Sequence, residues 1–385
     1  MHRQYYRRYV NSDTIMCVAG NRGSVSEIYY SYNGKVWNLA YSFLLPLGGN
    51  AFFSSMIYGN GIFVAIGPTI STFISPKSKT TYVYYSNDGI NWTRNILSTY
   101  SGIVDLNTYD YMVRYIKETG LFVIASMGRV YYSSDGENWS YYDFTGGASG
   151  KQLYDIRYDT YYSRYYACGD GVIVYSSDLI SWTEITNYLT PPPINLLPLP
   201  KLTRITMDNL GNIIITSDVS TVHMGSTNGT TFSNIISLPT SSLINDVTYK
   251  ENLGAFVVVG ATTSSEPTFQ YSTSANFPTF TVSTSGSMTE PTHIFSFRKN
   301  GSALIVGKNG KITNFHQLGP IARPFTYGSI DFVKYIGGTK YSFIIGNGVL
   351  YYGIEFKRMH ASSTSFSGVN LTCGAMDVEL NNNED

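Results

Sequence analysis

Short runs of apolar residues, each ended by glycine, asparagine, aspartate or serine, follow one another along the chain. Within these runs apolar and polar positions tend to alternate, which is the period of a half-buried β-strand. No segment shows the periodicity of an amphipathic helix over a useful length. The pattern therefore predicts a chain of short antiparallel strands joined by tight turns.

The first recurring unit is a pair of strands joined by a tight turn. Its first strand ends in an aromatic residue, and its second strand is apolar and ends in Gly or Ser. The aligned copies share one column of large side chains, formed by Tyr9, Tyr58, Tyr115, Tyr158, Met207, Tyr249, Phe297 and Tyr335. Recurrence of one pattern along a single chain predicts an internal repeat.

The second recurring unit reads Ser-x-Asp-Gly-x-x-Trp between two strands, with clear copies in 82–93, 130–140 and 174–185. Looser copies stand in 28–40, 224–235 and 270–281. In such a turn Asp or Asn accepts backbone N–H bonds, Gly takes a positive φ, and the aromatic residue returns to the sheet. The residues assigned to this structural role are Ser86, Asp88, Gly89, Trp92, Ser133, Asp135, Gly136, Trp139, Asp178 and Trp182.

Together the two units give four antiparallel strands per repeat, which is typical of a β-propeller blade. The sequence predicts an all-β propeller of eight blades over 1–360, with seven blades as the alternative because the last two units have degenerate third and fourth strands. We expect 361–385 to be a C-terminal extension. In it, VNLTCGAMDVEL pairs with a sheet edge or clasps the ring, and NNNED is a solvated acidic end.

The Ser-x-Asp-Gly-x-x-Trp copies resemble the Asp-box, or BNR-type, repeats of sialidase-like propellers. The spacing is one residue shorter than the commonest Asp-box spacing, and the match covers four of the units well. The resemblance implies a propeller fold in which the box is a structural corner away from the catalytic face. It implies no particular activity, because function resides in sites rather than in folds.

Long connections interrupt the repeats at 68–81, 94–110, 186–201 and 261–268. In a propeller these connections share one face, and variable loops on a rigid scaffold often bind ligands. The alternative is that the loops pack on one another or against a neighbouring subunit. The aromatic binding candidates in them are Phe73, Tyr100, Tyr109 and Tyr188.

Polar residues flank the shared aromatic column in the first strands. The first strand of a blade is innermost, so these side chains could face the central channel. Converging basic groups could hold a carboxylate or a phosphate; the alternative is a water-filled channel wall whose charges neutralise one another. The basic candidates are Arg8, Arg114, Arg157, Arg204 and Lys334, with Asp155 and Asp246 as acidic neighbours.

Composition narrows the function classes. The chain has 26 basic and 26 acidic residues, and charged residues are only 14% of it, against about 25% in typical domains. Zero net charge argues against electrostatic binding of nucleic acid or acidic membranes, and no apolar run is long enough for membrane insertion. Cys17, Cys168 and Cys373 form no disulfide framework, and the five histidines lack metal-ligand spacing, so we expect no metal and no cofactor.

The basic N-terminus has no apolar stretch behind it, so no secretory signal is expected. Sialidase activity would require an arginine triad, a Tyr nucleophile with a Glu partner, and an Asp that acts as the acid/base catalyst. No Glu lies beside a Tyr in the predicted inner strands, and the F/Y-R-I-P element of that family is missing. The sequence therefore favours a non-enzymatic propeller of a virion or phage tail, made in the host cytoplasm.

Such a component would serve assembly or host-surface glycan recognition. Its expected partners are other structural proteins of the assembly or a cell-surface glycan, with no nucleic acid. The alternatives are a cytoplasmic protein-interaction scaffold and a sialidase-like glycoside hydrolase.

Overall fold

The structure is a computed structural model of the 385-residue chain. The described residues are 15–32, 36–45, 53–72, 78–101, 111–185, 200–218, 224–234, 242–250, 254–262, 267–273, 277, 281–283, 291–296, 302–307, 311–316, 319–326, 332–336, 341–346, 349–354, 360–361 and 370–376.

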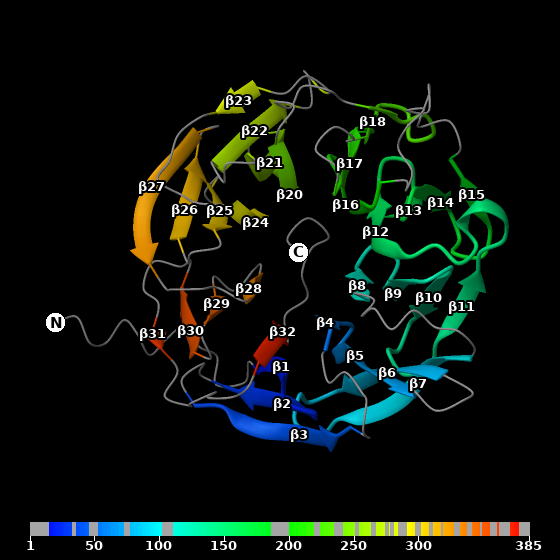
Figure 1. Cartoon of the computed structure of the whole chain (residues 1–385), viewed down its shortest axis with the longest axis vertical. Coiled ribbons are helices and arrows are strands. Elements are labelled where there is room, and N and C mark those ends of the chain that lie inside the picture. The colour runs from blue at the N-terminus through cyan, green and yellow to red at the C-terminus, as the bar shows by residue number, and fades with distance from the viewer. Residues whose placement is uncertain are drawn as a thin grey trace. The chain divides into compact units, whose positions relative to one another are not determined.

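Eight four-stranded antiparallel sheets lie in this described part of the chain (Figure 1). We call them blades 1 to 8 in chain order. The predicted fold class, an all-β propeller of four-stranded antiparallel blades, is confirmed. The arrangement of the blades in a ring of eight or seven stays a prediction.

The strands fall into four sets by their position in the blade. The first strands of blades 1 to 8 are β32 (Asn370–Met376), β4 (Ser55–Gly59), β8 (Met112–Ile116), β12 (Leu153–Asp159), β16 (Leu202–Met207), β20 (Ser242–Lys250), β24 (Pro291–Ser296) and β28 (Phe332–Ile336). The second strands are β1 (Met16–Arg22), β5 (Ile62–Thr72), β9 (Leu121–Ser126), β13 (Arg164–Gly169), β17 (Ile213–Ser217), β21 (Ala255–Thr262), β25 (Ser302–Gly307) and β29 (Tyr341–Gly346).

The third strands are β2 (Val25–Ser31), β6 (Ser78–Ser86), β10 (Arg129–Ser133), β14 (Val172–Ser176), β18 (Met224–Ser226), β22 (Pro267–Thr273), β26 (Lys311–His316) and β30 (Val349–Ile354). The fourth strands are β3 (Asn38–Leu44), β7 (Thr93–Ser101), β11 (Ser140–Asp143), β15 (Trp182–Glu184), β19 (Ser233–Asn234), β23 (Thr281–Ser283), β27 (Gly319–Thr326) and β31 (His360–Ala361). A 3-10 turn, η1 (Gly146–Ala148), is the only helix among the described residues.

The chain divides into two compact units. The first comprises Met1–Phe122, Ser133–Trp139 and Asp331–Leu380, and the second comprises Val123–Tyr132, Ser140–Ile330 and Asn381–Asp385. Within the first unit the first strands touch in the order β28, β32, β4 and β8. Within the second unit they touch in the order β12, β16, β20 and β24. Neighbouring blades of a unit therefore pack through their first strands.

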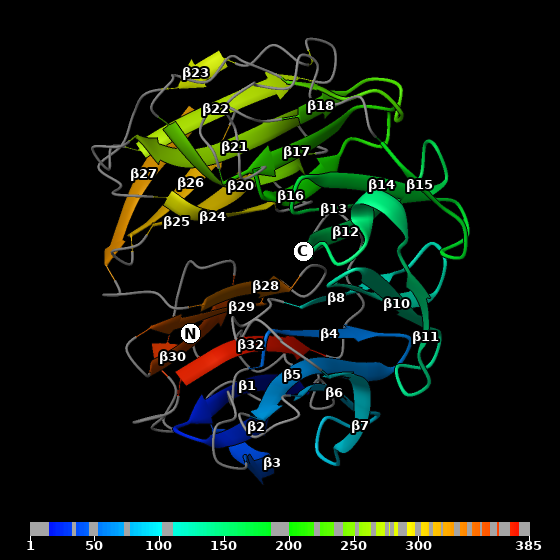
Figure 2. The same ribbon diagram turned by 45° about the vertical axis from the view of Figure 1, so that its right-hand side comes forward.

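Blade 1 takes its first strand from the C-terminal part of the chain. β32 pairs antiparallel with β1, from Met16 opposite Met376 to Asn21 opposite Asn370, and Figure 2 shows it in red beside β1. The repeat alignment predicts that a strand around Tyr9 fills this position. In the structure β32 fills it, and residues 1–14 lie outside the described residues.

The aromatic column has a packing role inside each blade. Each column tyrosine with a described side chain lies against an aromatic ring on the second strand of its own blade. Such cross-strand aromatic pairs stabilise antiparallel sheets. The ring centroids are 4.7 Å apart for Tyr58–Phe63, 4.9 Å for Tyr115–Phe122, 4.8 Å for Tyr158–Tyr165 and 5.0 Å for Tyr249–Phe256.

The turn between the third and fourth strands is organised by one side-chain oxygen. In blade 2, Oδ1 of Asp88 accepts the N–H groups of Ile90 at 2.9 Å and Asn91 at 2.7 Å. The hydroxyl of Ser86 donates to the same oxygen at 3.0 Å. The same contacts recur in blades 3 to 5 around Asp135, Asp178 and Asn228.

The residue after this Asp or Asn lies against the preceding blade. Gly89 has a φ of +67°, and a Cβ built on it would stand 2.8 Å from Sγ of Cys17, which lies on β1 of blade 1. Trp92 closes the turn by donating from Nε1 to the carbonyl of Gly89 at 2.9 Å. The same packing places Gly136 against Val64 of blade 2 and Gly229 against Tyr166 of blade 4.

These turns predict an acid-sensitive stability. Burial alone would raise the pKa of Asp88 and Asp135, but hydrogen bonds from the following residues and the preceding Ser outweigh it and lower both to about 2. An unfolded Asp has a pKa of about 3.9, so the unfolded chain binds more protons between the two values. The free energy of unfolding should therefore fall as the pH drops from about 4 to about 2.

Denaturant unfolding across this pH range measures the effect in two matched variants. Asp135→Asn keeps an acceptor oxygen, as Asn228 does naturally, but removes a titrating group and should make the dependence shallower. Asn228→Asp adds one and should make it steeper. An identical pH dependence in both variants and the unmodified chain would contradict this prediction.

Candidate functional site

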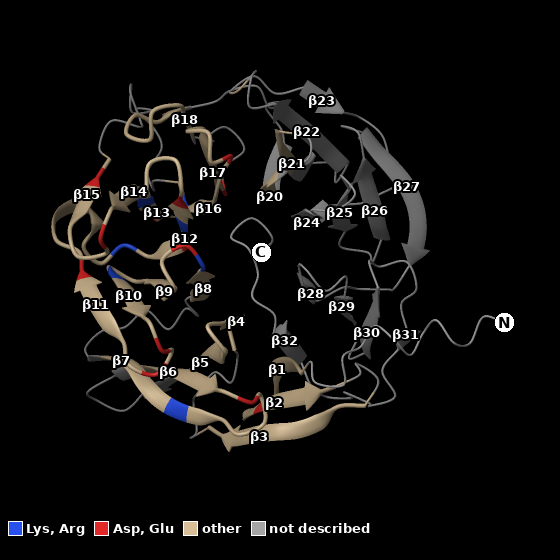
Figure 3. Cartoon of the chain, turned by 180° about the vertical axis from the view of Figure 1, so that it is seen from behind, with Lys and Arg blue, Asp and Glu red and all other residues tan. Residues whose placement is uncertain are grey.

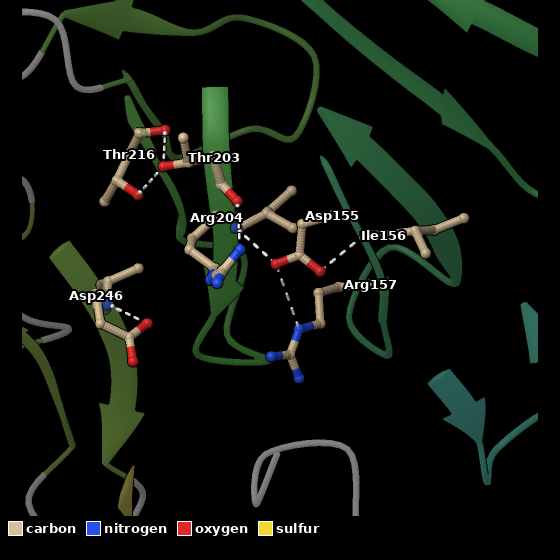
Figure 4. Close-up of polar contacts among 9 residues, drawn as sticks. Asp155, Ile156, Arg157, Thr203, Arg204, Thr216 and Asp246 are labelled. Carbon is tan, nitrogen blue, oxygen red and sulfur yellow. Dashed lines mark hydrogen bonds and ion pairs between the residues drawn. The ribbon is translucent and has the colours of Figure 1, made fainter. Parts of the chain in front are cut away.

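The first strands of blades 4, 5 and 6 gather polar side chains within the second unit (Figure 4). Figure 3 shows basic and acidic positions on β12 and β16. Each of these strands has a register shift directly before a charged residue, and such bulges re-aim the side chains next to them. The shifts fall between Leu153 and Asp155, between Leu202 and Arg204, and between Ile244 and Asp246.

Asp155 joins blade 4 to blade 5. Its side chain is fully buried. Oδ1 accepts the N–H of Ile156 at 2.9 Å, and Oδ2 accepts the N–H of Ile205, on β16 of the next blade, at 3.1 Å. A buried backbone donor needs such a partner, so this carboxylate holds the two first strands in register.

Each of the two arginines in this group contacts an oxygen atom of a residue close to it in the sequence. Nε of Arg157 lies 3.9 Å from Oδ2 of Asp155, and the Arg157 side chain is 16% exposed. Nη1 of Arg204 donates to the carbonyl of Thr203 at 3.0 Å. On β20, Oδ1 of Asp246 accepts the N–H of Val247 at 2.9 Å. The group thus combines both signs of charge and is partly engaged in backbone bonds.

The structure brings together two of the five predicted basic residues, Arg157 and Arg204. Arg114 is buried on β8 and belongs to the first unit. Lys334 lies on β28, and its side chain is outside the described residues, as is Arg8. The anion pocket predicted from all five residues therefore stays a prediction.

The connection predicted as a loop over 68–81 is mostly strand. β5 continues to Thr72, β6 begins at Ser78 and β7 runs to Ser101, so three strands extend beyond the end of β4. This segment, rich in Thr and Ile, favours extended backbone. We call Thr69–Thr72, Ser78–Thr81 and Ser98–Ser101 the blade 2 extension.

The blade 2 extension carries hydroxyl groups and one of the aromatic candidates. The hydroxyls of Thr80 and Thr99 lie 3.3 Å apart and are exposed, whereas Thr81 is fully buried and donates to the hydroxyl of Tyr111 at 3.2 Å. Tyr100 pairs with Lys79 in the backbone register. The other three aromatic candidates, Phe73, Tyr109 and Tyr188, lie outside the described residues.

Two further kinds of feature would bear on function in the described part of the chain, namely metal-ligand clusters of three or more side chains and membrane-spanning helices. There, no group of three or more His, Cys, Asp or Glu could hold a metal ion. No described helix has the length and apolar character needed to span a membrane.

No protein-family model matches the sequence, and no curated protein matches it. The chain is similar in structure to the dihydro-heme d1 dehydrogenase NirN, with a TM-score of 0.59 and 9% identity over 96% of this chain and 76% of that one. It is also similar to AztD from Citrobacter koseri, with a TM-score of 0.53 and 8% identity over 94% and 97% of the two chains. The computationally designed protein Ika8 gives a TM-score of 0.52 and 10% identity over 82% and 88%. At these identities the likeness shows the fold alone.

The role of Asp155 predicts the cost of removing it. Asp155→Ala leaves two buried N–H donors without a partner and should lower the free energy of unfolding by about 2–4 kcal/mol. Asp155→Asn keeps one acceptor oxygen and should cost roughly half as much. Urea unfolding measures both variants. A loss under about 0.5 kcal/mol for Asp155→Ala, the range of ordinary surface changes, would show that the two strands do not depend on this carboxylate.

Proposed function

We propose that this chain is a non-catalytic binding propeller of a virion or phage tail, and that it serves assembly or the recognition of host-surface glycans. We also propose that its repeated turn is of the Asp-box type. The observation that carries the proposal is the blade 2 extension, in which the hydroxyls of Thr80 and Thr99 lie 3.3 Å apart and Tyr100 pairs with Lys79 at the next register position. Successive residues of a strand face opposite sides of the sheet, so these two pairs offer a glycan two separate contact points.

The chemistry of the extension suits a sugar. An aromatic ring can cover the apolar face of a sugar ring, and hydroxyl groups both donate to and accept from sugar hydroxyls. A lysine adds a cation for an acidic sugar. The low and balanced charge of the chain, 14% charged with a net charge of zero, agrees with a ligand recognised by hydroxyl bonds and stacking.

The role of the inner strands also supports a non-catalytic function. Asp155, a central acidic residue among the first strands, is fully buried and bonded to two backbone N–H groups. A catalytic carboxylate must instead reach the substrate. We infer that this acid serves the packing of the blades.

A glycan array probed with the purified chain tests the proposal. Tyr100→Ala should reduce binding at least tenfold, because it removes the stacking ring. The matched control is Tyr161→Ala, which removes an exposed tyrosine from the turn between β12 and β13. Absence of glycan binding above background, or equal loss in both variants, would reject the extension as the recognition site.

The neighbouring genes test the virion assignment separately. Capsid and tail genes on either side of the coding sequence would support it. A position among genes for cytosolic proteins would favour the interaction scaffold instead.

A further inference from the structure

Two aspartates are buried at one junction between neighbouring blades of the second unit. Asp159 ends β12, and Asp208 directly follows β16, so both stand immediately after the aromatic column of the repeat. They are 0% and 4% exposed. The same repeat position holds Gly59 in blade 2 and Ile116 in blade 3. A buried acid costs free energy unless its charge is compensated.

This repeat position faces the next blade. In blade 2, the ring of Tyr115 from blade 3 lies so close to Gly59 that an added Cβ would overlap it. By the same geometry of the repeat, Asp159 stands at the interface between blades 4 and 5. The first strands of these two blades, β12 and β16, are in contact.

The described structure provides incomplete compensation for Asp159. Its Oδ1 accepts the N–H of Tyr161 at 2.9 Å, whereas its Oδ2 is buried and has no hydrogen-bond partner among the described residues. Arg164 stands opposite Asp159 in the ladder, but its guanidinium lies over the ring of Tyr175 at 4.9 Å. A buried polar atom without a partner indicates a bound water, ion or proton.

Three further oxygen atoms meet where blade 4 contacts blade 5. The hydroxyl of Tyr162 is 3.1 Å from the carbonyl oxygen of Gly211 and 3.1 Å from that of Thr227. Its one proton can serve only one of them. Burial raises the pKa of Tyr162, and the charges of Asp159 and Asp208 raise it further, in keeping with carboxylates close to this hydroxyl.

Asp208 retains capacity to bind a cation. Its Oδ1 accepts the N–H groups of Leu210 at 2.8 Å and Asn212 at 3.0 Å, and its Oδ2 accepts the Asn212 side-chain amide at 2.7 Å. A carboxylate has about four acceptor positions, so one remains. These bonds fix the carboxylate in place.

We propose that the junction of blades 4 and 5 binds a hard divalent cation of the Ca²⁺ class, with Asp159 and Asp208 as its charged ligands. Carbonyl and hydroxyl oxygens of the adjoining turns complete the ligand set. Oxygen-only ligands suit Ca²⁺, whose coordination is flexible. With two carboxylates the affinity should be modest, with a dissociation constant of about 10⁻⁴–10⁻³ M.

The test uses the full chain with two variants. Asp159→Asn removes the unpartnered carboxylate oxygen, and Glu118→Gln removes an exposed acid from the corresponding turn of blade 3. Thermal unfolding is measured in chelator and in about 10 mM Ca²⁺. Binding is measured directly by tyrosine-sensitised Tb³⁺ luminescence and its displacement by Ca²⁺.

We expect Ca²⁺ to raise the melting temperature of the unmodified chain and of Glu118→Gln, because a ligand of the folded state stabilises it. Asp159→Asn should lose both this shift and the Tb³⁺ emission, and in chelator it should be no less stable than the unmodified chain. Equal Ca²⁺ responses in all three proteins would overturn the proposal.

No Ca²⁺ response in the unmodified chain would overturn it as well. In that case the pH dependence of stability shows whether a proton neutralises the buried Asp159 carboxylate instead. Lowering the pH toward the ordinary pKa of Asp, about 4, would then stabilise the unmodified chain but not Asp159→Asn, because burial and the charge of Asp208 raise the pKa of Asp159.

Discussion

A four-stranded sheet has two faces, and a blade of this size cannot bury either face without a neighbour. The contact between blades is therefore the constraint on which the rest of this fold depends. In blades 2, 3 and 5 a turn glycine makes this contact possible, because it lies against the second strand of the preceding blade. The carboxylate or amide of the same turn holds the backbone in the required shape, so one short motif supplies both the corner and the contact.

The sequence was enough to predict the fold class because each turn carries its own chemistry. The position of Asp88, Gly89 and Trp92 within one repeat already specifies a corner. Blade 4 shows the limit of this reasoning. Leu179 occupies the glycine position with a φ of 63° and is buried, so packing there outweighs the cost of a left-handed backbone for a side chain with a Cβ.

Features that depend on distant pairing were not predictable. The repeat alignment predicts a first strand around Tyr9, and for the C-terminal segment the sequence predicts only that it pairs with some sheet edge or clasps the ring. In the structure β32 of that segment pairs with β1, across almost the whole length of the chain. No local signal specifies such a partner. The bulges before Asp155 and Arg204 depend on pairing in the same way. The sequence therefore predicted that Asp155 lies among residues of the channel wall, but not that its carboxylate accepts two backbone N–H groups.

Of the candidate site, sequence identified residue types and approximate places. Arg157 and Arg204 do lie together on neighbouring first strands of one unit. The buried acids Asp155 and Asp159 share a location, because both lie where blade 4 contacts blade 5. Charge in this chain is scarce, and part of it is placed at contacts between blades.

The central claim is that the turn glycines stabilise the fold through contact with the preceding blade. Comparing Gly89→Ala with Gly61→Ala by denaturant unfolding tests it directly. Gly61 has a φ of +79° and no heavy atom within 4 Å of the place a Cβ would take, whereas Gly89 has a φ of +67° and faces Sγ of Cys17. Both variants should lose about 1–2 kcal/mol through the backbone, and Gly89→Ala should lose about 1–3 kcal/mol more through overpacking. Equal losses in the two variants would contradict the claim.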